Sequence, residues 1–536
     1  MNLSNHFPEG YTPTKAQSKT LDAIEEAFSK HDTVILTAPT GTGKSFFGTT
    51  ISRVARQISE TKHDDIVTYK AFDIDHHGTY TNDTPYEPHG ALALTITKSL
   101  QDQYKKLFNC TTLKGKNNYI STIDPTMDVE IESAVIPRKI LHTHRINNKC
   151  NYYNDRRDLL TNNFGVTNYK MFMALPGHVK HRDYLICDEA SELEDELVSQ
   201  CSCQIKYDNL SRNGINIPTL TSESPLTVYA WLDDLVQTLQ EQRLYLQRVL
   251  QKKSTWSSRN QSKYRFINNL LSQVTICANN FYNCEYIVEK KYDHVHLTPL
   301  YIDQLANNIL SFGRKRLLMS ATIIDHRSFA KSLGIKDYQY IDVPSEFDCK
   351  KSPIYVSNKY PLSRKTIKQF LPKIVNNISD ILKHHHNEKG VIHTHTHEIT
   401  QFIYETIDRY KSRLICREPG KSNEDILDDH SLSSNNTVLM SPSLTYGIDL
   451  KDDLARFQVI VKLPYLPLHD KRVKRLFETD PEWYENKMLN SLVQACGRAT
   501  RSKDDHSVTY ILDGMIGKIL LKCKHKLPKH FLHRFM

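Results

Sequence analysis

The sequence predicts an α/β protein with parallel sheets in two lobes, together with an insertion and a helical unit within the first lobe. Three observations carry this prediction. Short apolar runs alternate with helical patterns in both halves of the chain, which is typical of parallel sheets. The region 109–163 is polar and loses this periodicity, so it interrupts the first lobe. The region 192–312 is too long for one connection between two strands, so it should form a unit of its own.

Length and composition are those of an ordinary globular protein with several domains. The chain has 536 residues, of which 39% are hydrophobic and 24% charged. No apolar run reaches the length of a membrane span and no signal pattern opens the chain, so we expect a cytoplasmic protein without a membrane partner. The formal net charge of +9 fits a polyanionic partner without requiring one. The scattered cysteines indicate reduced thiols.

The first lobe is organised around residues 38–45, which read Ala-Pro-Thr-Gly-Thr-Gly-Lys-Ser. A buried-strand pattern precedes this stretch and a helical pattern begins close to Lys44. Glycines let backbone N–H groups approach an anion, and a helix N-terminus adds partial positive charge. The stretch therefore predicts a nucleoside triphosphate site, in which Lys44 reaches the terminal phosphates and the Ser45 hydroxyl holds Mg²⁺. The loop residues assigned to the nucleotide are Thr40, Gly41, Thr42, Gly43, Lys44 and Ser45.

Two alternatives accompany this first motif. A strand–turn–helix corner could need glycine for purely structural reasons, but the complete Gly-Lys-Ser ending disfavours that interpretation. Upstream, Gln17 opens a helical pattern, and its amide could read an adenine edge because it offers both a donor and an acceptor. Taken alone, a glutamine in that place is more often a surface residue at the start of a helix.

The next strand pattern, within residues 92–108, feeds directly into a helix. Thr97, Lys98 and Ser99 follow the strand at its carboxyl end, where open α/β sheets place their ligands. After the insertion, residues 164–169 return to strand character.

An acidic pair, Asp188 and Glu189, stands at the end of another short apolar strand. Asp188 is suited to hold Mg²⁺, and Glu189 to orient or deprotonate the water that attacks the γ-phosphate. An acidic pair at the end of a strand is usually a solvated turn. The phosphate loop earlier in the chain favours the catalytic interpretation.

The region 192–312 is largely helical and polar, with an amphipathic run from Val228 to Leu239. Its tyrosines and lysines could bind single-stranded nucleic acid by stacking and by charge. A simple solvated helical domain explains the same composition equally well.

The second lobe repeats the strand-and-helix alternation from about residue 345 onward. A strand at 316–322 that ends in Ser320 and Thr322 precedes it, and the loop 446–449 could approach a nucleotide. The predicted strands of the second lobe are 390–395, 437–441 and 459–461.

Near the end of the chain, residues 494–501 read Gln-Ala-Cys-Gly-Arg-Ala-Thr-Arg. Arg498 and Arg501 are three positions apart, so on a helix both would project from one face. Two guanidinium groups opposite a phosphate loop are what arginine-finger catalysis requires. A lone Arg-x-x-Arg pattern is usually a solvated face, and only the preceding motifs raise its rank.

The ordered motifs resemble those of superfamily 2 helicases, and more closely those of the DinG/XPD type. The helicase-level motifs are Gly-Thr-Gly-Lys-Ser at 41–45, Asp-Glu-Ala-Ser at 188–191, Ser-Ala-Thr at 320–322 and the stretch 494–501. The motifs closer to the DinG/XPD type include Lys-Gly-Lys-Asn-Asn-Tyr at 114–119, Pro-Ser-Glu-Phe-Asp at 344–348 and Lys-Leu-Pro-Tyr-Leu-Pro at 462–467.

The resemblance implies two RecA-like domains that close on ATP and Mg²⁺. The first domain would comprise 1–108, 164–191 and 313–343, and the second 344–536. Residues 109–163 would correspond to the iron–sulfur domain of the family, and 192–312 to its helical arch.

The activity implied by the resemblance is that of an ATP-dependent DNA helicase or translocase, moving 5′ to 3′ on single-stranded or forked DNA in repair or replication, with a monomer as the expected state. The alternatives are an RNA helicase, a duplex translocase, or a nucleotide-gated remodeller that does not unwind. The resemblance implies that Gln17 contacts adenine and that hydrolysis is performed by Lys44, Ser45, Asp188 and Glu189. It implies that Ser320 and Thr322 couple hydrolysis to strand movement, and that the nucleic acid is contacted by Thr97, Lys98 and Ser99. The site would be completed from the second domain by Gly447, Asp449, Gln494, Arg498 and Arg501.

The insertion departs from the family pattern of four cluster-binding cysteines. Ser121 stands where the first cysteine is expected, no cysteine lies between 111 and 149, and Cys150 alone matches the last ligand. We therefore expect no iron–sulfur cluster, which needs four thiolates. A zinc site made by Cys110, His142, His144 and Cys150 is a rival interpretation, and an insertion that packs without metal is the simpler one. The histidines at 384–386, 393, 395 and 397 are interpreted as surface and strand-face residues.

Overall fold

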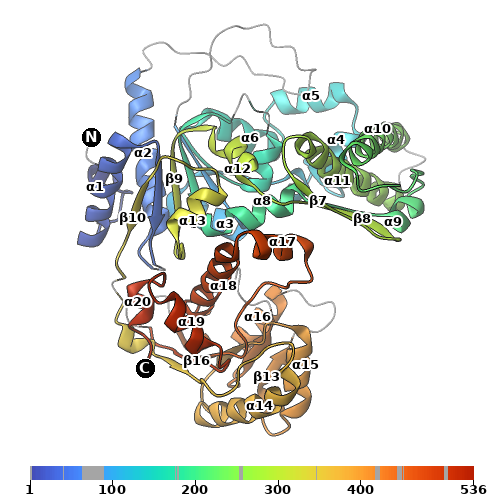
Figure 1. Cartoon of the computed structure of the whole chain (residues 1–536). Helices are drawn as coiled ribbons and strands as arrows, with labels where there is room; N and C mark the ends of the chain where they lie inside the picture. The colour runs from blue at the N-terminus through green and yellow to red at the C-terminus, as the bar shows by residue number, and fades with distance from the viewer. Residues whose placement is uncertain are drawn as a thin grey trace. The chain divides into compact units, whose positions relative to one another are not determined.

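The computed structural model describes residues 3–39, 41–62, 90–175, 177, 180–252, 257–345, 347–416, 423–442, 450, 452–499 and 505–536. These residues form two compact units (Figure 1). The first unit comprises Met1–Leu36, Ser45–Met319 and Phe329–Ile341. The second comprises Thr37–Lys44, Ser320–Ser328 and Asp342–Met536.

A seven-stranded sheet is the centre of the first unit, with the strand order β10-β1-β9-β5-β2-β4-β3. Strands β1 and β2 are buried along their whole length, as expected for a sheet covered on both faces. The predicted strands of this lobe are confirmed. The strands are β1 (Thr33–Thr37), β2 (Ala91–Thr95), β3 (Thr111–Leu113), β4 (Phe164–Asn168), β5 (Arg182–Asp188), β9 (Gly313–Ser320) and β10 (Gln339–Asp342).

The carboxyl ends of β1, β9 and β5 meet at one edge of this sheet. β5 pairs with β9 in parallel. At one end of the β1–β9 pair the Arg316 N–H donates to the Asp32 carbonyl, and at the other the Ala38 N–H donates to the Ser320 carbonyl, so these strands also run in the same direction. The sheet therefore places the segments that follow Thr37, Asp188 and Ser320 at the same edge.

The helices of the first unit's α/β part follow the predicted pattern. Helix α1 (Lys15–Lys30) buries Leu21, Ile24 and Phe28 at helical spacing. Helices α2 (Lys44–Lys62) and α3 (Lys98–Phe108) each begin where the sequence predicted. The remaining elements are η1 (Leu3–His6), α7 (Tyr169–Ala174), η4 (Ala190–Glu192) and α13 (His326–Ser332).

The insertion is more regular than its polar sequence predicts. Strand β3, near the start of the predicted insertion, joins the main sheet beside β4. The helices that follow are short or largely polar, so their apolar period does not show in the sequence. They are η2 (Lys116–Asn118), α4 (Val129–Val135), α5 (Arg138–Ile146) and α6 (Asn151–Thr161).

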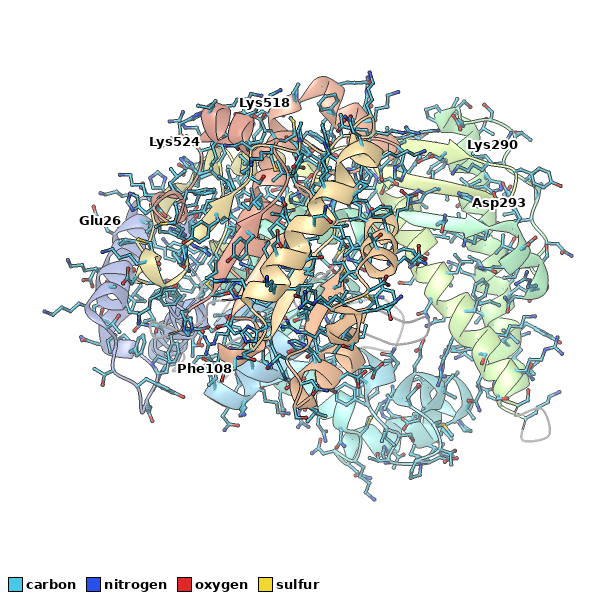
Figure 2. All side chains as sticks on the ribbon, turned by 90° about the horizontal axis from the view of Figure 1, so that it is seen from below. Glu26, Phe108, Lys290, Asp293, Lys518 and Lys524 are labelled. Carbon is cyan, nitrogen blue, oxygen red and sulfur yellow. The ribbon has the colours of Figure 1, made fainter. Side chains whose placement is uncertain are left out.

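The region 192–312 combines helices with a three-stranded antiparallel sheet that the sequence did not predict. Its strands, in the order β6-β8-β7, are short, and only β6 alternates buried and exposed residues along its whole length. Lys290 and Asp293 lie at the turn between β7 and β8 (Figure 2). The elements are α8 (Leu193–Cys201), β6 (Cys203–Lys206), α9 (Tyr207–Arg212), α10 (Pro225–Leu250), α11 (Ser258–Phe281), β7 (Tyr286–Lys290), β8 (His294–Pro299) and α12 (Asp303–Leu310).

The insertion and the long helices α10 and α11 share one hydrophobic core. Ile131 and Ala134 of α4 belong to the same buried cluster as Leu235 of α10 and Leu271 of α11. The rim is polar: the Arg265 guanidinium lies 2.7 Å from a carboxylate oxygen of Asp128. The Asn268 amide also donates to Glu130 at 2.8 Å.

The second unit contains a six-stranded parallel sheet, in the order β11-β16-β15-β12-β14-β13. The strands predicted in this lobe are confirmed. The strands are β11 (Ile354–Val356), β12 (Gly390–His393), β13 (Leu414–Cys416), β14 (Val438–Ser441), β15 (Phe457–Ile460) and β16 (Val508–Ile511). The helices are α14 (Ile367–His384), α15 (His397–Thr406), α16 (Asn423–Leu432), α17 (Lys471–Thr479), α18 (Pro481–Cys496), α19 (Ile516–Cys523) and α20 (Lys529–Leu532), with short turns η6 (Cys349–Lys351), η7 (Lys411–Arg413) and η8 (Asp452–Leu454).

Among the helices described, none is both long and apolar enough to cross a membrane.

Candidate active site

The phosphate loop leaves β1 and ends at the first turn of α2. Gly41 and Gly43 have φ values of 83° and 85°, a left-handed conformation that glycine adopts without strain. The Thr42 N–H and hydroxyl both donate to the Pro39 carbonyl, at 3.2 and 2.7 Å. Lys44 and Ser45 open the helix, and the N-terminus of a helix favours an anion. Thr40, also assigned to this loop, lies outside the described residues.

The acidic pair stands at the end of β5. Asp188 is its last residue, and one of its carboxylate oxygens accepts the Glu189 N–H at 2.9 Å. Glu189 has a φ of 51°, which is uncommon for a residue other than glycine. Such a conformation persists only where the surrounding structure imposes it, and it is found most often at functional sites.

Tyr104 of α3 joins the two predicted magnesium ligands, and the sequence did not identify it. Its side chain is fully buried, and its hydroxyl donates to the second carboxylate oxygen of Asp188 at 3.0 Å. Burial, reinforced by the charge of Asp188, raises the pKa of Tyr104 well above its usual range, and the Ser45 hydroxyl, a hydrogen-bonding neighbour of the same phenol, opposes this. The Tyr104 hydroxyl therefore bonds Asp188 and has Ser45 as a neighbour. A hydroxyl and a carboxylate suit Mg²⁺, which prefers oxygen ligands.

In the sequence, Tyr104 is one more large residue in an amphipathic helix, a position that normally indicates core packing. No local signal distinguishes it, because its neighbours Ser45 and Asp188 come from distant parts of the chain.

Hydrogen bonds within the second unit join the phosphate loop to α18. The Ala38 N–H donates to the Ser320 carbonyl at 2.9 Å. The Thr322 N–H lies 3.4 Å from the Ser320 hydroxyl, and the Gln494 side chain donates to the Thr322 hydroxyl at 3.0 Å. Three of the predicted site residues, Ser320, Thr322 and Gln494, are thus brought together.

The prediction that Arg498 lies on a helix is wrong. Helix α18 ends at Cys496, and Gly497 takes the C-cap position with its N–H bonded to the Val493 and Gln494 carbonyls. Arg498 therefore lies beyond the helix, while Arg501, Gly447 and Asp449 fall outside the described residues.

The end of α18 is fixed by two buried side chains. The Cys496 carbonyl accepts a hydrogen bond from the Gln458 amide at 2.9 Å and another from the Arg534 guanidinium at 3.1 Å. Arg534 also donates to the Ser352 carbonyl at 2.7 Å. A cation at a helix C-terminus complements the helix dipole, so Arg534 stabilises the end of the helix that carries Gln494.

His393 ends β12 inside the second unit. Its side chain is 6% exposed, and the Gln458 side chain is its hydrogen-bonding neighbour. Burial, with the nearby charge of Arg498 adding to it, lowers the pKa of His393 to about 4. The imidazole is therefore neutral at neutral pH. The interpretation of this histidine as a strand residue is confirmed, and it is buried rather than exposed.

The residues predicted to contact nucleic acid lie at the start of α3. The Thr97 hydroxyl caps the helix by accepting the Leu100 N–H at 3.2 Å. The Lys98 ammonium donates to the Asn118 side chain at 2.6 Å. Gln17 has a similar capping role at α1: its side chain accepts the Thr14 N–H, which is the structural alternative that the sequence left open.

The donor atoms in the insertion do not fit an iron–sulfur cluster. Ser121 is buried, and its hydroxyl closes a turn by accepting the N–H groups of Ile123 and Asp124 at 3.1 and 3.0 Å. Cys150 is the one residue that matches a cluster-binding cysteine of the family. It is buried, and burial raises the pKa of its thiol. One thiol cannot supply a ligand set of four thiolates.

The zinc alternative is wrong for the part of the chain that the structure describes. No three or more histidine, cysteine, aspartate or glutamate side chains in that part come together as metal ligands, so the proposed set of Cys110, His142, His144 and Cys150 does not form. Aromatic and cationic side chains pack in the insertion instead. The Arg145 guanidinium lies 3.8 Å from the centre of the Tyr153 ring, and the Lys116 ammonium lies 5.6 and 5.5 Å from the ring centres of Tyr152 and Tyr153.

Comparisons with known proteins agree with these motifs. Residues 378–533 match the helicase C-terminal domain family. One segment is 30% identical over 83 residues to the regulator of telomere elongation helicase 1 homolog of Caenorhabditis elegans. That match covers 12% of this chain and only 8% of the relative, so most of the relative's length has no counterpart in the match.

Two solved structures share the fold over nearly the whole chain. An XPD helicase structure superposes with a TM-score of 0.63 at 18% identity, covering 98% of this chain and 99% of that one. The S. tokodaii Xpd4 structure gives a TM-score of 0.56 at 13% identity, covering 97% of this chain and 98% of that one. Both similarities concern the fold, which consists of two RecA-like domains with additions to the first.

Proposed function

We propose that the chain is a superfamily 2 helicase of the DinG/XPD type, which couples ATP hydrolysis to movement along single-stranded DNA and to duplex unwinding. The observation that carries the proposal is that the Tyr104 hydroxyl bonds Asp188 and has Ser45 as a neighbour. It supports a metal–triphosphate site built from a phosphate loop and an acidic strand end, as ATP hydrolysis requires.

Each residue of this site has a proposed task. The loop N–H groups and Lys44 bind the phosphates, while Gln17 contacts the adenine. Ser45 and Asp188 hold Mg²⁺, which when bound offsets the negative charge of the phosphates. Glu189 orients the attacking water and accepts its proton. Arg498 and Arg501 stabilise the charge that develops on the transferred phosphate, while Gly447 and Asp449 complete the nucleotide site.

We propose that Ser320, Thr322 and Gln494 couple hydrolysis to movement. Their hydrogen bonds form a continuous connection with the phosphate loop at Ala38. Loss of the γ-phosphate would alter the loop, and this connection would carry the change to α18. Thr97, Lys98 and Ser99 contact the strand, whose 5′ to 3′ direction of travel is inferred from the resemblance.

The cofactors in this proposal are ATP and Mg²⁺, without an iron–sulfur cluster, because the donor set in the insertion does not fit one. A cytoplasmic monomer acting on single-stranded or forked DNA, in repair or replication, completes the proposal.

The first test is a Lys44→Ala substitution. It should abolish ATP hydrolysis stimulated by single-stranded DNA, because the phosphates lose their main positive partner. Lys30→Ala is the matched control: Lys30 is an exposed residue of α1 paired only with Glu26 of the same helix, so its loss should leave turnover unchanged. DNA-stimulated turnover that survives in Lys44→Ala would rule out this site.

A second assay separates the alternative functions. ATP turnover is measured with single-stranded DNA and with RNA, beside unwinding of duplexes that carry a 5′ or a 3′ tail. Stimulation by DNA with unwinding of the 5′-tailed duplex is the expected result. Preferential stimulation by RNA would indicate an RNA helicase, and turnover without strand separation would indicate a translocase or a remodeller.

A further inference from the structure

We propose that Tyr104 is a positioning residue for the metal ligands Ser45 and Asp188, and that α3 uses it to couple nucleic-acid binding to metal–nucleotide binding. The inference rests on the proposed function, since it assumes that the start of α3 contacts a strand. It adds Tyr104 to the proposed site, and it adds a coupling through α3 that no sequence motif indicates.

The Tyr104 hydroxyl is placed to set the orientation of Asp188. One carboxylate oxygen of Asp188 is held by the Glu189 N–H at 2.9 Å and the other by Tyr104 at 3.0 Å. With both oxygens bonded, the carboxylate plane is fixed before a metal ion arrives. Partners of this kind, which contact a metal ligand rather than the metal, commonly determine metal affinity.

A glycine in α2 brings this helix close to β5 and α3. A Cβ added at Gly48 would lie 3.2 Å from Ile186 Cγ2 and 3.6 Å from the Tyr104 hydroxyl oxygen. Glycine inside a helix is destabilising by roughly 0.5–1 kcal/mol relative to alanine. Its presence here is explained by the close contact, which keeps Ser45 of α2 within reach of the phenol.

Helix α3 connects this phenol to the predicted strand contacts as a rigid body. Lys98 and Tyr104 lie on the same uninterrupted helix, about 9 Å apart along its axis at 1.5 Å per residue. Gln101, between them, is fully buried and donates to the Leu113 carbonyl at 3.3 Å, so the helix is anchored along its inner face. A displacement of the first turn must therefore move Tyr104 as well.

A second contact leads from the same helix to Ser45. The Phe108 ring, at the end of α3, packs edge-on against Phe46 with ring centres 5.2 Å apart. Phe46 follows Ser45 directly in α2. The end of α3 thus holds the backbone next to one metal ligand, while Tyr104 binds the side chain of the other.

The coupling works through the position of α3. A nucleic-acid phosphate bound near Lys98 at the helix N-terminus would hold the helix against the sheet and keep the Tyr104 hydroxyl on Asp188. Metal–nucleotide binding would then be tighter with nucleic acid bound. By linkage, metal and nucleotide must tighten nucleic-acid binding by the same factor.

The test measures Mn²⁺ binding to the ADP-bound full-length protein by electron paramagnetic resonance, with and without a single-stranded oligonucleotide. Tyr104→Phe removes only the hydroxyl. We expect it to weaken Mn²⁺ binding by about tenfold and to abolish the effect of the oligonucleotide on that affinity. The Mg²⁺ concentration for half-maximal ATP turnover should rise by a similar factor.

Two further variants make the result specific. Tyr169→Phe is the matched control, because Tyr169 is also fully buried beside β5 and its hydroxyl makes no hydrogen bond with Asp188. Its Mn²⁺ affinity should equal that of the wild type. Lys98→Ala should reduce the effect of the oligonucleotide on Mn²⁺ affinity.

The outcomes separate this inference from the proposed function. Wild-type Mn²⁺ affinity in Tyr104→Phe would overturn the positioning role, and a retained oligonucleotide effect in that variant would overturn the coupling. A wild-type protein that binds Mn²⁺ and ADP but does not hydrolyse ATP would contradict only the proposed function. The positioning role would still stand, because it is tested by Mn²⁺ affinity and not by ATP turnover.

Discussion

At the scale of single residues, buried and half-buried histidines make the second unit sensitive to acid. Burial is the main cause that lowers the pKa values of His393, His395 and His530, each to about 4. In an unfolded chain a histidine titrates near about 6.5. Between these two values the unfolded chain binds a proton that the folded chain does not, so the free energy of unfolding falls as the pH drops from about 6.5 to 4.

His393→Leu isolates the contribution of the most buried of the three. Lowering the pH from 7.5 to 5.5 should reduce the free energy of unfolding of the wild type by about 1.4 kcal/mol through this residue. Over the same change in pH, the free energy of unfolding of the variant should fall by about 1.4 kcal/mol less. Urea titrations followed by circular dichroism at both pH values measure the difference. An equal loss in both proteins would show that His393 titrates normally in the fold.

Also at this scale, the sequence identifies residues whose role depends on local pattern and misses those whose role depends on distant neighbours. Lys44 and Ser45 are predicted because glycines, a strand and a helix surround them in the sequence. Tyr104 and Arg534 are not, because their partners Asp188 and Cys496 become neighbours only after folding. Arg498 lies between these cases, since its motif is recognisable while its position beyond the helix is set by Gly497.

At the scale of secondary-structure elements, the end of α18 depends on the last residues of the chain. Arg534 bonds the Cys496 carbonyl, and its own carbonyl accepts the Ile354 N–H of β11 at 2.7 Å. Phe535 adds an isolated bridge to the same strand residue. These contacts fix the segment that carries Gln494 and leads to Arg498.

Arg534→Gln should therefore lower ATP turnover by about ten- to hundredfold, because a catalytic group displaced by about 1 Å loses activity on this scale. The matched control is Arg413→Gln. Arg413 likewise donates to backbone carbonyls of the second unit, those of Leu382, His385, Glu388 and Asn436, but not to α18. Both variants should lower the melting temperature, and only the first should reduce kcat. An equal fall in kcat would mean that general destabilisation explains the effect.

The elements themselves were predicted unevenly, for physical reasons. Fully buried parallel strands are continuous apolar runs, so β1 and β5 stand out in the sequence. Strand β3 is short and begins Thr-Thr, and the small sheet β6-β8-β7 has mixed burial, so both resemble loops in the sequence. The helices of the insertion were missed because α4 and α5 are short and α6 is largely polar, with little apolar periodicity.

At the scale of the whole molecule, the two long additions to the first lobe act as one structure. The insertion contributes Ile131 and Ala134 to the core of α10 and α11, and Asp128 pairs with Arg265 at its rim. A core shared in this way supplies apolar burial that a small isolated insertion would lack. Such burial can replace the stabilisation that a metal cluster gives to a small domain.

Metal removal tests this explanation. Purified protein should contain neither stoichiometric iron nor acid-labile sulfide, because Cys150 is the single thiol in the matching positions. Treatment with ferricyanide and EDTA, followed by dialysis into Mg²⁺, should leave the melting temperature and ATP turnover unchanged. Asp128→Ala should instead lower the melting temperature, by loosening the insertion from α11. Stoichiometric iron, or a melting temperature that falls after oxidation and chelation, would show that a cluster rather than the shared core holds the insertion.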